Sequence, residues 1–451
     1  MKKYHFIAIG GIGMSGLAKY LLEDGHRVTG SDIEDGKYIK VIREMGATVN
    51  VGHHENNLPN DTDTVVVSTA IKPTNPELKK ARDLGIGIYH RSDLLAEVAR
   101  SAQAANKCFI GFAGTHGKTT TSGMASYVLD MSKKSPAFVV GGIVPEINTN
   151  AQHKTGEHFV AELDESDGTL VKYSPDILVI NNLEEDHLDF YKNGMSDLIK
   201  TFNQSISKSK KVIVNADDNG VRQLTGKFIT FGIKNTANYM AKNIASSPNG
   251  TKFDVFYNDK KLTEIQLVLT GLHNVYNTLA VIAALNESGV DIGRVKEHFA
   301  TFTGMGRRFQ KVYEFNGIKI YDDYAHHPTE INAVLDAAST KFGKKNIVAV
   351  FQPHRYTRLQ GLWNEFKGAF KNANRVIVTD VYAASEDSIP GVSGQNFAHE
   401  SKFEHIPGKI DEVAKKLLPT LKSGDVVVGL GAGTITNLGK YIKEYTSVKT
   451  K

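Results

Sequence analysis

The sequence predicts an α/β fold built from three domains. Short apolar runs rich in Val and Ile alternate with helix-like segments along most of the chain, which is the pattern of doubly wound parallel sheets. The chain has 451 residues, and at about 150 residues per domain this length suits three cores. The hydrophobic share of 41% and the charged share of 23% are those of an ordinary globular protein. A disordered, collagen-like or coiled-coil chain is therefore excluded.

Cysteine content, charge and hydropathy narrow the class of protein further. A single cysteine, Cys108, excludes a disulfide framework and a CxxC zinc site, and it suits a reducing compartment. The net charge of +5 is spread over the chain without a Lys/Arg block, so no nucleic-acid partner is expected. The sequence has no run of about 18 apolar residues, so no membrane span is predicted. The apolar run after Met1 is too short for a signal peptide. We expect a cytoplasmic protein.

The expected elements fall in order along the chain. Buried parallel strands are predicted at Phe6–Ile9, Thr64–Ser68, Cys108–Ala113, Ile177–Asn181, Val212–Asn215, Ile347–Phe351, Val376–Thr379 and Val426–Gly429. Helices are predicted at Leu17–Leu22, Thr119–Met131, Asn277–Asn286 and Thr329–Ala338. The segments Lys227–Ile233 and Thr251–Leu269 alternate in the manner of antiparallel strands. A polar stretch at 100–107 and a glycine-rich one at 303–306 predict domains at 1–105, 106–306 and 307–451.

The first expected strand ends in a glycine-rich turn. Gly11, Gly13 and Gly16 fit the pattern G-x-G-x-x-G, with Met14 and Ser15 between them. Such a turn lets backbone amides approach a pyrophosphate at the positive end of a helix. Asp32 follows the next expected strand, where an acidic residue can meet a ribose hydroxyl. The pattern alone leaves three interpretations open, namely a nicotinamide dinucleotide, another nucleotide diphosphate, or a purely structural tight turn.

A second glycine-rich turn follows the expected strand Cys108–Ala113 and opens a helix. It reads Gly114-Thr115-His116-Gly117-Lys118-Thr119-Thr120. Gly-Lys-Thr is the core of a P-loop, in which amides cradle phosphates, the lysine meets the β/γ-phosphates and the hydroxyl meets Mg²⁺. Phe112 stands where the strict Walker pattern has its first glycine. Two phosphate-binding turns in one chain indicate an enzyme that uses ATP on a substrate that itself carries a nucleotide.

Two acidic segments after expected strands are candidates for metal ligands. One contains Glu162 and Glu165, and the other contains His187. Carboxylates at the carboxyl ends of strands beside a P-loop are where Mg²⁺ ligands belong, and the histidine suits a second ion. Whether Glu162 or Glu165 is the main ligand stays open. A solvated, acidic helix start is the alternative for the second segment.

Basic residues follow the expected strand Ile347–Phe351. His354, Arg355 and Arg358 form a cluster there, and an arginine fork matches a carboxylate in geometry and charge. A solvated basic loop is the alternative interpretation. A third glycine-rich strand-to-helix turn, Gly429–Gly433, favours close packing of a helix on a strand.

These residues resemble the Mur ligases over nearly the whole length of the chain. The resemblance is carried by eight segments in order, Gly10–Ala18, Ala113–Thr121, Val160–Asp167, Glu185–Asp189, His273–Asn277, Gly306–Phe309, Asp322–Glu330 and Gln352–Arg358. Three positions depart from the family pattern, Leu163, Glu185 and Leu359. The resemblance implies a Rossmann-like N-terminal domain, a central P-loop ATPase-type mononucleotide-binding domain and a Rossmann-like C-terminal domain.

The resemblance also implies an activity with ATP and Mg²⁺ as cofactors. L-alanine would be joined to the carboxylate of UDP-N-acetylmuramate through an acyl phosphate, in peptidoglycan precursor synthesis. A relative that attaches a recycled tripeptide instead is the close alternative. An NAD-dependent oxidoreductase and an ATP-gated sensor of a nucleotide sugar are the alternatives from other classes.

Each candidate residue takes a role from this resemblance. The catalytic group would be Lys118, Glu162, His187, Arg308 and Asp323. ATP would be bound by Gly114, Thr115, His116, Gly117, Lys118, Thr119, Thr120, Asn274, Asn277 and Arg308. Thr119, Glu162 and His187 would hold the metal, and Arg355 and Arg358 the amino-acid carboxylate. The UDP substrate would meet Gly11, Gly13, Met14, Ser15, Gly16, Asp32 and His326. Of the adjacent pair His326 and His327, one is expected to face substrate and the other to cap the turn before Pro328.

Overall fold

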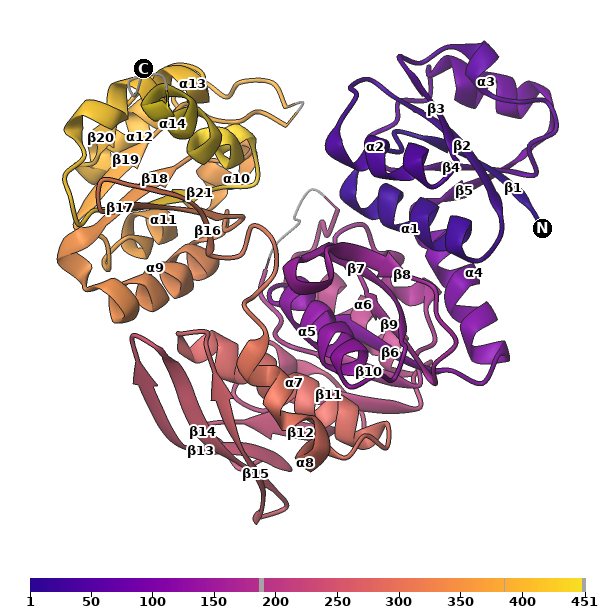
Figure 1. Cartoon of the computed structure of the whole chain (residues 1–451), viewed down its shortest axis with the longest axis horizontal. Helices are drawn as coiled ribbons and strands as arrows, with labels where there is room; N and C mark the ends of the chain where they lie inside the picture. The colour runs from indigo at the N-terminus through magenta and orange to yellow at the C-terminus, as the bar shows by residue number, and fades with distance from the viewer. Residues whose placement is uncertain (186–189, 385, 448–451) are drawn as a thin grey trace. The chain divides into compact units, whose positions relative to one another are not determined.

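The computed structural model describes residues 1–185, 190–384 and 386–447. By internal contacts the chain divides into two compact units. The first unit comprises Met1–Lys242, Asp254–Ile265 and Tyr276–Phe302, and the second comprises Asn243–Phe253, Gln266–Val275 and Thr303–Lys451. The described residues form three sheets flanked by helices, one in each of the expected domains, which confirms the predicted fold class (Figure 1). In the described part of the chain no helix has the length and apolar character needed to cross a membrane.

The N-terminal sheet has the strand order β3-β2-β1-β4-β5, and its paired strands are all parallel. Its strands are β1 (Lys3–Ile7), β2 (Arg27–Asp32), β3 (Thr48–Val51), β4 (Thr64–Val67) and β5 (Gly87–His90). Its helices are α1 (Ile12–Glu23), α2 (Lys37–Glu44), η1 (Glu55–Asn57), α3 (Pro76–Asp83) and α4 (Arg91–Ala104). The order reverses between β1 and β4, and ligands of open α/β sheets bind at the carboxyl ends of strands at such a point. The first glycine-rich turn lies there, directly after β1.

The central sheet has the order β15-β14-β13-β12-β11-β10-β6-β9-β7-β8. Its strands are β6 (Cys108–Ala113), β7 (Ala137–Val144), β8 (Thr149–Gln152), β9 (His158–Glu162), β10 (Ile177–Ile180), β11 (Lys211–Asn215), β12 (Ile229–Gly232), β13 (Tyr239–Ser247), β14 (Gly250–Tyr257) and β15 (Lys260–Leu267). Its helical segments are α5 (Lys118–Met131), η2 (Pro145–Ile147), η3 (Thr169–Lys172), α6 (Met195–Ile206), η4 (Val221–Gln223), α7 (Leu272–Glu287), α8 (Ile292–Val295) and η5 (Lys296–Thr301). Strand β6, which leads into the second turn, pairs in parallel with β10 and β9.

Part of the antiparallel prediction for this sheet is wrong. Strand β12, within the predicted segment Lys227–Ile233, runs parallel to both neighbours, with Ile213 opposite Ile229 and Phe231 opposite Tyr239. The connection through η4 returns the chain to the starting end of the sheet, so the next strand adds in parallel. Beyond it, β13, β14 and β15 are joined by two-residue turns, which only hairpins accommodate.

Helix α1 belongs to the first sheet and also packs on the central one, within the same unit. It contacts β7 and β8 as well as β2, α2 and α4 (Figure 1). A Cβ added to Gly16 would lie 2.7 Å from Nδ2 of Asn150 and 3.5 Å from Cβ of Ala151. The amide of Asn150 donates to the carbonyl of Ile12 over 2.8 Å. The third glycine of the turn is therefore needed for the contact with β8, and one buried core runs through both sheets.

The C-terminal sheet has the order β16-β17-β21-β18-β19-β20, in which only the β16–β17 pair is antiparallel among the described strands. Its strands are β16 (Gln310–Phe315), β17 (Ile318–Asp323), β18 (Ile347–Phe351), β19 (Arg375–Val378), β20 (Glu404–His405) and β21 (Val426–Leu430). Its helical segments are α9 (Pro328–Phe342), η6 (Lys344–Asn346), α10 (Tyr356–Gly361), α11 (Trp363–Ala369), α12 (Gly394–Ser401), α13 (Ile410–Leu417), η7 (Leu418–Thr420), η8 (Thr434–Asn437) and α14 (Leu438–Ser447). Apolar clusters cover both faces of this sheet.

A buried carboxylate ties the first sheet together. Glu77, in the first turn of α3, is fully buried. Its Oε2 accepts from Nε2 of His5 and from the hydroxyl of Ser31, each over 2.7 Å. Its Oε1 lies 3.1 Å from Nδ1 of His53. Burial opposes the charge, but these hydrogen bonds hold the pKa of Glu77 below its usual value.

Replacing this carboxylate tests its share in stability. We expect Glu77→Gln to lower the free energy of unfolding by about 3 kcal/mol at pH 7, because buried donors lose a charged acceptor. Because the folded pKa is depressed, this advantage exists above the unfolded value of 4.5 and is lost as the pH falls below it. Urea unfolding at pH 7 and at about pH 4 should therefore show the gap between variant and wild type closing. Glu55→Gln, at an exposed position of η1, is the control, and a constant gap would contradict the assignment.

Candidate active site

The second glycine-rich turn has the conformation of a phosphate-binding loop. It connects β6 to α5, and Gly114 and Gly117 have φ angles of +123° and +83°. A Cβ on Gly114 would lie 2.8 Å from the carbonyl oxygen of Asn182, so the position requires glycine for space as well as for conformation. Gly117 is the N-cap of α5, whose first-turn amides have no acceptor within the helix. These amides, at Lys118, Thr119 and Thr120, face the position that a phosphate would take.

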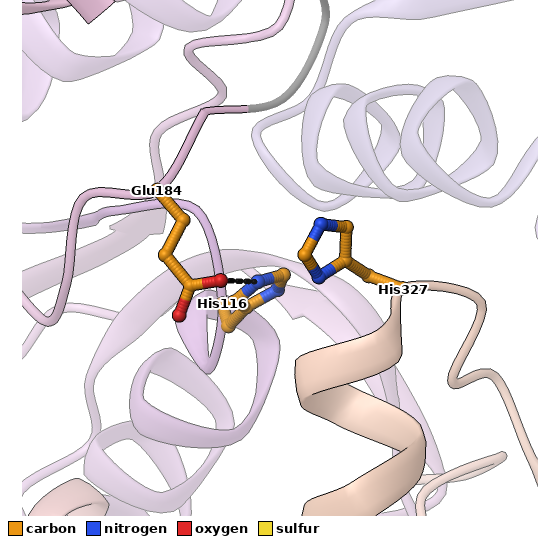
Figure 2. Close-up of side chains that lie close together, drawn as sticks. All are labelled: His116, Glu184 and His327. Atoms are coloured by element: carbon orange, nitrogen blue, oxygen red, sulfur yellow. Dashed lines mark ion pairs between the residues drawn. The ribbon is translucent and has the colours of Figure 1, made fainter. Parts of the chain in front are cut away.

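The segment after β10 supports the loop from outside. The carbonyl of Asn182 accepts from the amide of Thr115, and its side chain accepts from the amide of His116 over 2.7 Å. The hydroxyl of Thr115 accepts from the amide of Glu184, and His116 pairs with the Glu184 carboxylate over 3.5 Å (Figure 2). Sequence reasoning missed Asn182, although its place directly after a buried strand, at the edge where the loop begins, was an available signal.

Lys118 is held inside its own loop. Its ammonium donates to the carbonyls of Gly114 and Thr115 over 2.7 and 3.1 Å, and it lies 2.9 Å from Oε2 of Glu165. Only 14% of the Lys118 side chain and 1% of the Glu165 side chain are exposed. Burial raises the pKa of Glu165 to about 7, whereas the pKa of Lys118 stays above its usual value because nearby carboxylates outweigh its burial. A phosphate that binds Lys118 therefore replaces, or shares, a carboxylate contact.

The predicted metal ligands divide between described and undescribed residues. Glu162 is the last residue of β9. It pairs with Phe112 of β6, which lies two residues before Gly114, so Glu162 is close to the start of the second turn. Oε2 of the Glu162 carboxylate accepts from the amide of Gly141 over 2.9 Å. Together with the hydroxyl of Thr119 it offers hard oxygen donors next to the loop, a donor set that suits Mg²⁺. Glu165 is instead paired with Lys118, and His187 lies outside the described residues.

The two predicted asparagines of α7 lie in different surroundings. A Cβ on Gly117 would lie 2.7 Å from Oδ1 of Asn277, so the Asn277 side chain borders the second glycine-rich turn. Asn274, one turn earlier, belongs to the other unit and donates to the carbonyl of Thr270 over 2.8 Å. The structure therefore brings Asn277 together with the second glycine-rich turn in the first unit.

The first glycine-rich turn is closed by Asp32. Oδ2 of this carboxylate accepts from the amide of Gly10 over 2.8 Å, so the acid shapes the turn. The side chains of Met14 and Ser15 are buried, and the Ser15 hydroxyl donates to the carbonyl of Ile12. The turn thus presents backbone amides from the start of α1, which is what a diphosphate requires.

The basic cluster of the second unit is assembled after β18. His354 stacks on Tyr382 at an interplanar angle of 17°, and Nη1 of Arg358 lies 3.4 Å from Nδ1 of His354. Burial and the surrounding cations lower the pKa of His354 to about 3, so its imidazole is neutral and accepts from Arg358. Arg355 has a φ of +70°, a costly conformation for a residue with a side chain, and its amide donates to the carbonyl of Tyr382. Strain held at such a position is typical of a binding site.

Asp323 and Arg308 lie in the same unit. Oδ2 and Oδ1 of Asp323 accept from the amides of Phe309 and Ala325 over 2.6 and 2.7 Å, so Asp323 shapes the chain on both sides of itself. Burial raises the pKa of Asp323 to about 7. Arg308 lies 3.7 Å from the carboxylate of Glu330.

The two adjacent histidines separate in role. His327 lies at the start of α9 (Figure 2). It is the N-cap of this helix and its ring accepts from the amide of Thr329, so His327 is the member of the pair that caps the turn before Pro328. His326, predicted at the UDP substrate, lies with its ring centroid 5.8 Å from that of His354. The structure thus places His326 in the basic cluster of the second unit, and its assignment to the UDP substrate stays a prediction.

Comparison with known proteins gives a family for this arrangement. Three family models match in order, described as "Mur ligase family, catalytic domain" over residues 3–103, "Mur ligase middle domain" over 112–285 and "Mur ligase, glutamate ligase domain" over 307–433. Together they span most of the chain.

Individual relatives are similar to this chain over its full length. The UDP-N-acetylmuramate–L-alanine ligase of Aquifex aeolicus is 38% identical, covering 99% of this chain and 97% of its own. The enzyme of the same name from Sulfurihydrogenibium is 41% identical, covering 100% and 99%. Among solved structures, UDP-N-acetylmuramate–alanine ligase MurC of Thermotoga maritima aligns with a TM-score of 0.85 at 32% identity, covering 99% and 100%. The fold, the two glycine-rich strand-to-helix turns and these full-length matches lead to one conclusion: the chain belongs to the Mur ligase family.

Proposed function

We propose that the protein joins L-alanine to the carboxylate of UDP-N-acetylmuramate, with ATP converted to ADP and phosphate. The observation that carries this proposal is the likeness to L-alanine ligases over the whole chain, at up to 41% identity among the relatives given above. The two phosphate-binding turns, built from separate strands of the first unit, supply a place for a nucleotide-linked substrate and a place for ATP. The reaction belongs to peptidoglycan precursor synthesis.

The first chemical step is activation of the muramoyl carboxylate. One of its oxygens attacks the γ-phosphorus of ATP, the bond to the β-phosphate oxygen breaks, and an acyl phosphate and ADP result. Two anions must approach each other, so charge neutralisation and alignment are the main tasks of the protein. Lys118 and the first-turn amides of α5 serve the β- and γ-phosphates, and Asn277 borders them.

A divalent cation fits beside this loop. Thr119 and Glu162 would hold Mg²⁺ through oxygen atoms, with His187 as the further ligand that the family resemblance implies. When bound, the ion supplies positive charge at the phosphate oxygens, which favours attack by an anionic nucleophile. Glu165 contributes differently, because its carboxylate fixes the Lys118 ammonium.

The second step is attack by the amine. The uncharged amino group of L-alanine adds to the acyl carbon. As the tetrahedral intermediate collapses, the bond from carbon to the phosphate oxygen breaks, phosphate leaves, and the nitrogen gives its extra proton to phosphate or water, which leaves the amide. We assign the alanine carboxylate to Arg355 and Arg358, since the guanidinium fork gives paired hydrogen bonds to a carboxylate. The neutral His354 orients Arg358 without adding another charge.

The activity itself is tested by phosphate release from ATP. We expect turnover only when UDP-N-acetylmuramate and L-alanine are both present, because the acyl phosphate needs an acceptor. Lys118→Met should lower kcat by about 10²–10³ while leaving the affinity for the UDP substrate within about twofold, since removal of a preorganised cation affects the transition state. Lys200→Met, at an exposed position of α6, is the control. Turnover that needs the tripeptide and ignores L-alanine would assign the chain to the alternative ligase.

The pairing of Glu165 with Lys118 makes a separate prediction. In Glu165→Ala the ammonium loses its carboxylate contact and keeps only carbonyl acceptors at hydrogen-bond distance, with Asp164 and Glu162 acting at longer range, so the free energy of unfolding without ligand should fall by about 3 kcal/mol. ATP then restores an anion that the variant lacks, so the rise in Tm on adding ATP should exceed that of the wild type. Thermal unfolding with and without ATP measures both values. Equal shifts in the two proteins would show that Glu165 and the phosphate do not share Lys118.

The amino-acid subsite is tested by changing fork geometry while keeping charge. We expect Arg358→Lys to raise KM for L-alanine about tenfold or more, because an ammonium cannot give the paired contact and cannot donate to His354 in the same geometry. Steady-state kinetics with each substrate varied in turn measures the effect, and KM for ATP should change by less than twofold. An equal rise in KM for ATP would contradict the assignment.

A further inference from the structure

Arg91 lies between the first glycine-rich turn and the loop that follows β9. It is the first residue of α4, and its Nη2 donates to Oδ2 of Asp164 over 2.6 Å. A Cβ built on Gly13 would lie 3.8 Å from Nη1 of the same guanidinium. All three residues belong to the first unit. One edge of the guanidinium thus meets a carboxylate of the central domain while the neighbouring nitrogen borders the turn of the N-terminal domain.

The position of Arg91 is fixed from both sides. The N-cap His90 and Asp93 form a capping box that sets the start of α4. Lys172, from η3, donates to Oδ1 of Asp93 over 2.6 Å and to the hydroxyl of Ser92 over 3.0 Å, which joins the same stretch of α4 to the central domain a second time. Asp164 is itself held, because its Oδ1 accepts from the amide of Ser166. The Arg91–Asp164 ion pair therefore joins two backbone segments that are each held in place by their own hydrogen bonds.

The charge of Arg91 suits the ligand expected at this turn. The start of α1 supplies amides but carries no basic side chain in its first turn, Ile12-Gly13-Met14-Ser15. A diphosphate brings two negative charges, and amides with a helix dipole offset them only in part. A guanidinium has five N–H donors in a planar fork, so an edge bound to Asp164 leaves others for an anion.

We propose that Arg91 binds the diphosphate of the UDP substrate at the first turn, and that Asp164 is the positioning residue that holds Arg91 there. The inference rests on the proposed function, which places a UDP-linked substrate at this turn. The acidic loop after β9 then has two tasks in adjacent residues. Asp164 positions Arg91 beside the first turn, and Glu165 positions Lys118 in the second turn.

Calorimetric titration of the full chain with UDP, without ATP, tests the first half. Arg91→Met should weaken UDP binding about ten- to one-hundredfold, the loss expected for a hydrogen bond to a charged group. Lys172→Met is the matched control, because it removes a second ion pair between the same two segments, and it should change UDP affinity by less than twofold. Equal losses in both variants would overturn the proposal, since the contact between segments would then account for the effect.

The same titration with UDP-N-acetylmuramate identifies the group that Arg91 contacts. A diphosphate contact predicts the same fold-loss for UDP and for the whole substrate. A loss seen with the whole substrate alone would overturn the diphosphate assignment, because it would place Arg91 on the muramoyl carboxylate.

A double-mutant cycle tests the positioning role of Asp164. We expect Asp164→Asn to weaken UDP binding about threefold to tenfold, and Arg91→Met with Asp164→Asn to match Arg91→Met alone, because Asp164 acts through Arg91. Arg91→Lys should recover part of the affinity when Asp164 is intact and less when it is Asn. Additive losses in the double variant would overturn the positioning role.

These outcomes are separable from the proposed function. If the wild-type chain binds UDP and both variants behave as expected but L-alanine is not incorporated, then the activity assignment fails and the Arg91 assignment stands. If L-alanine is incorporated and Arg91→Met binds UDP as well as the wild type does, then the Arg91 assignment alone fails.

Discussion

The buried pair between Lys118 and Glu165 constrains how the second glycine-rich turn is built. An ammonium with so little exposed surface needs acceptors on every side, and the chain provides the carbonyls of Gly114 and Thr115 together with one carboxylate. Those carbonyls must turn inward, which fixes the peptide planes of the loop and requires the positive φ of Gly114. The Asn182 side chain then holds the next peptide from outside. The loop is therefore held in shape by contacts within the chain, and such preorganisation lowers the ordering cost of binding a ligand.

The two glycine-rich turns reach similar shapes for different reasons. In the second turn, Gly114 and Gly117 are required by backbone conformation and by the closeness of Asn182 and Asn277. In the first turn, Gly16 is required because β8 packs on α1. Glycine spacing alone does not separate these causes. The carboxylate of Asp32 likewise serves the Gly10 amide, so an acid after the second strand does not by itself indicate a ribose partner.

Contacts between residues that are close together in the sequence could be predicted from the sequence. The strand–loop–helix around Lys118, the basic residues after β18 and the cap before α9 follow from local pattern, since the relevant contacts span a few positions. Asp164, Glu165, Asn182 and Arg91 were not assigned their contacts, because these depend on which strands lie side by side. The β6–β9 and β6–β10 pairings bring residues more than 40 positions apart to one edge. The antiparallel prediction for β12 was wrong for the same reason. Alternation of polar and apolar residues within one strand does not indicate the direction of the strand beside it.

The contact of α1 with β7 and β8 has a consequence for how the protein is made. The helix emerges among the first 23 residues, but the strand that covers its Gly16 face ends at residue 152. During synthesis the N-terminal sheet can pair its five strands while one face of α1 stays exposed to solvent, because β7 and β8, which cover that face, have not yet been translated. The final folding step of the first domain is therefore delayed until β7 and β8 of the second domain have been made and have folded. The first glycine-rich turn is completed by contacts from a neighbouring domain, so the N-terminal sheet alone does not supply all the packing of α1.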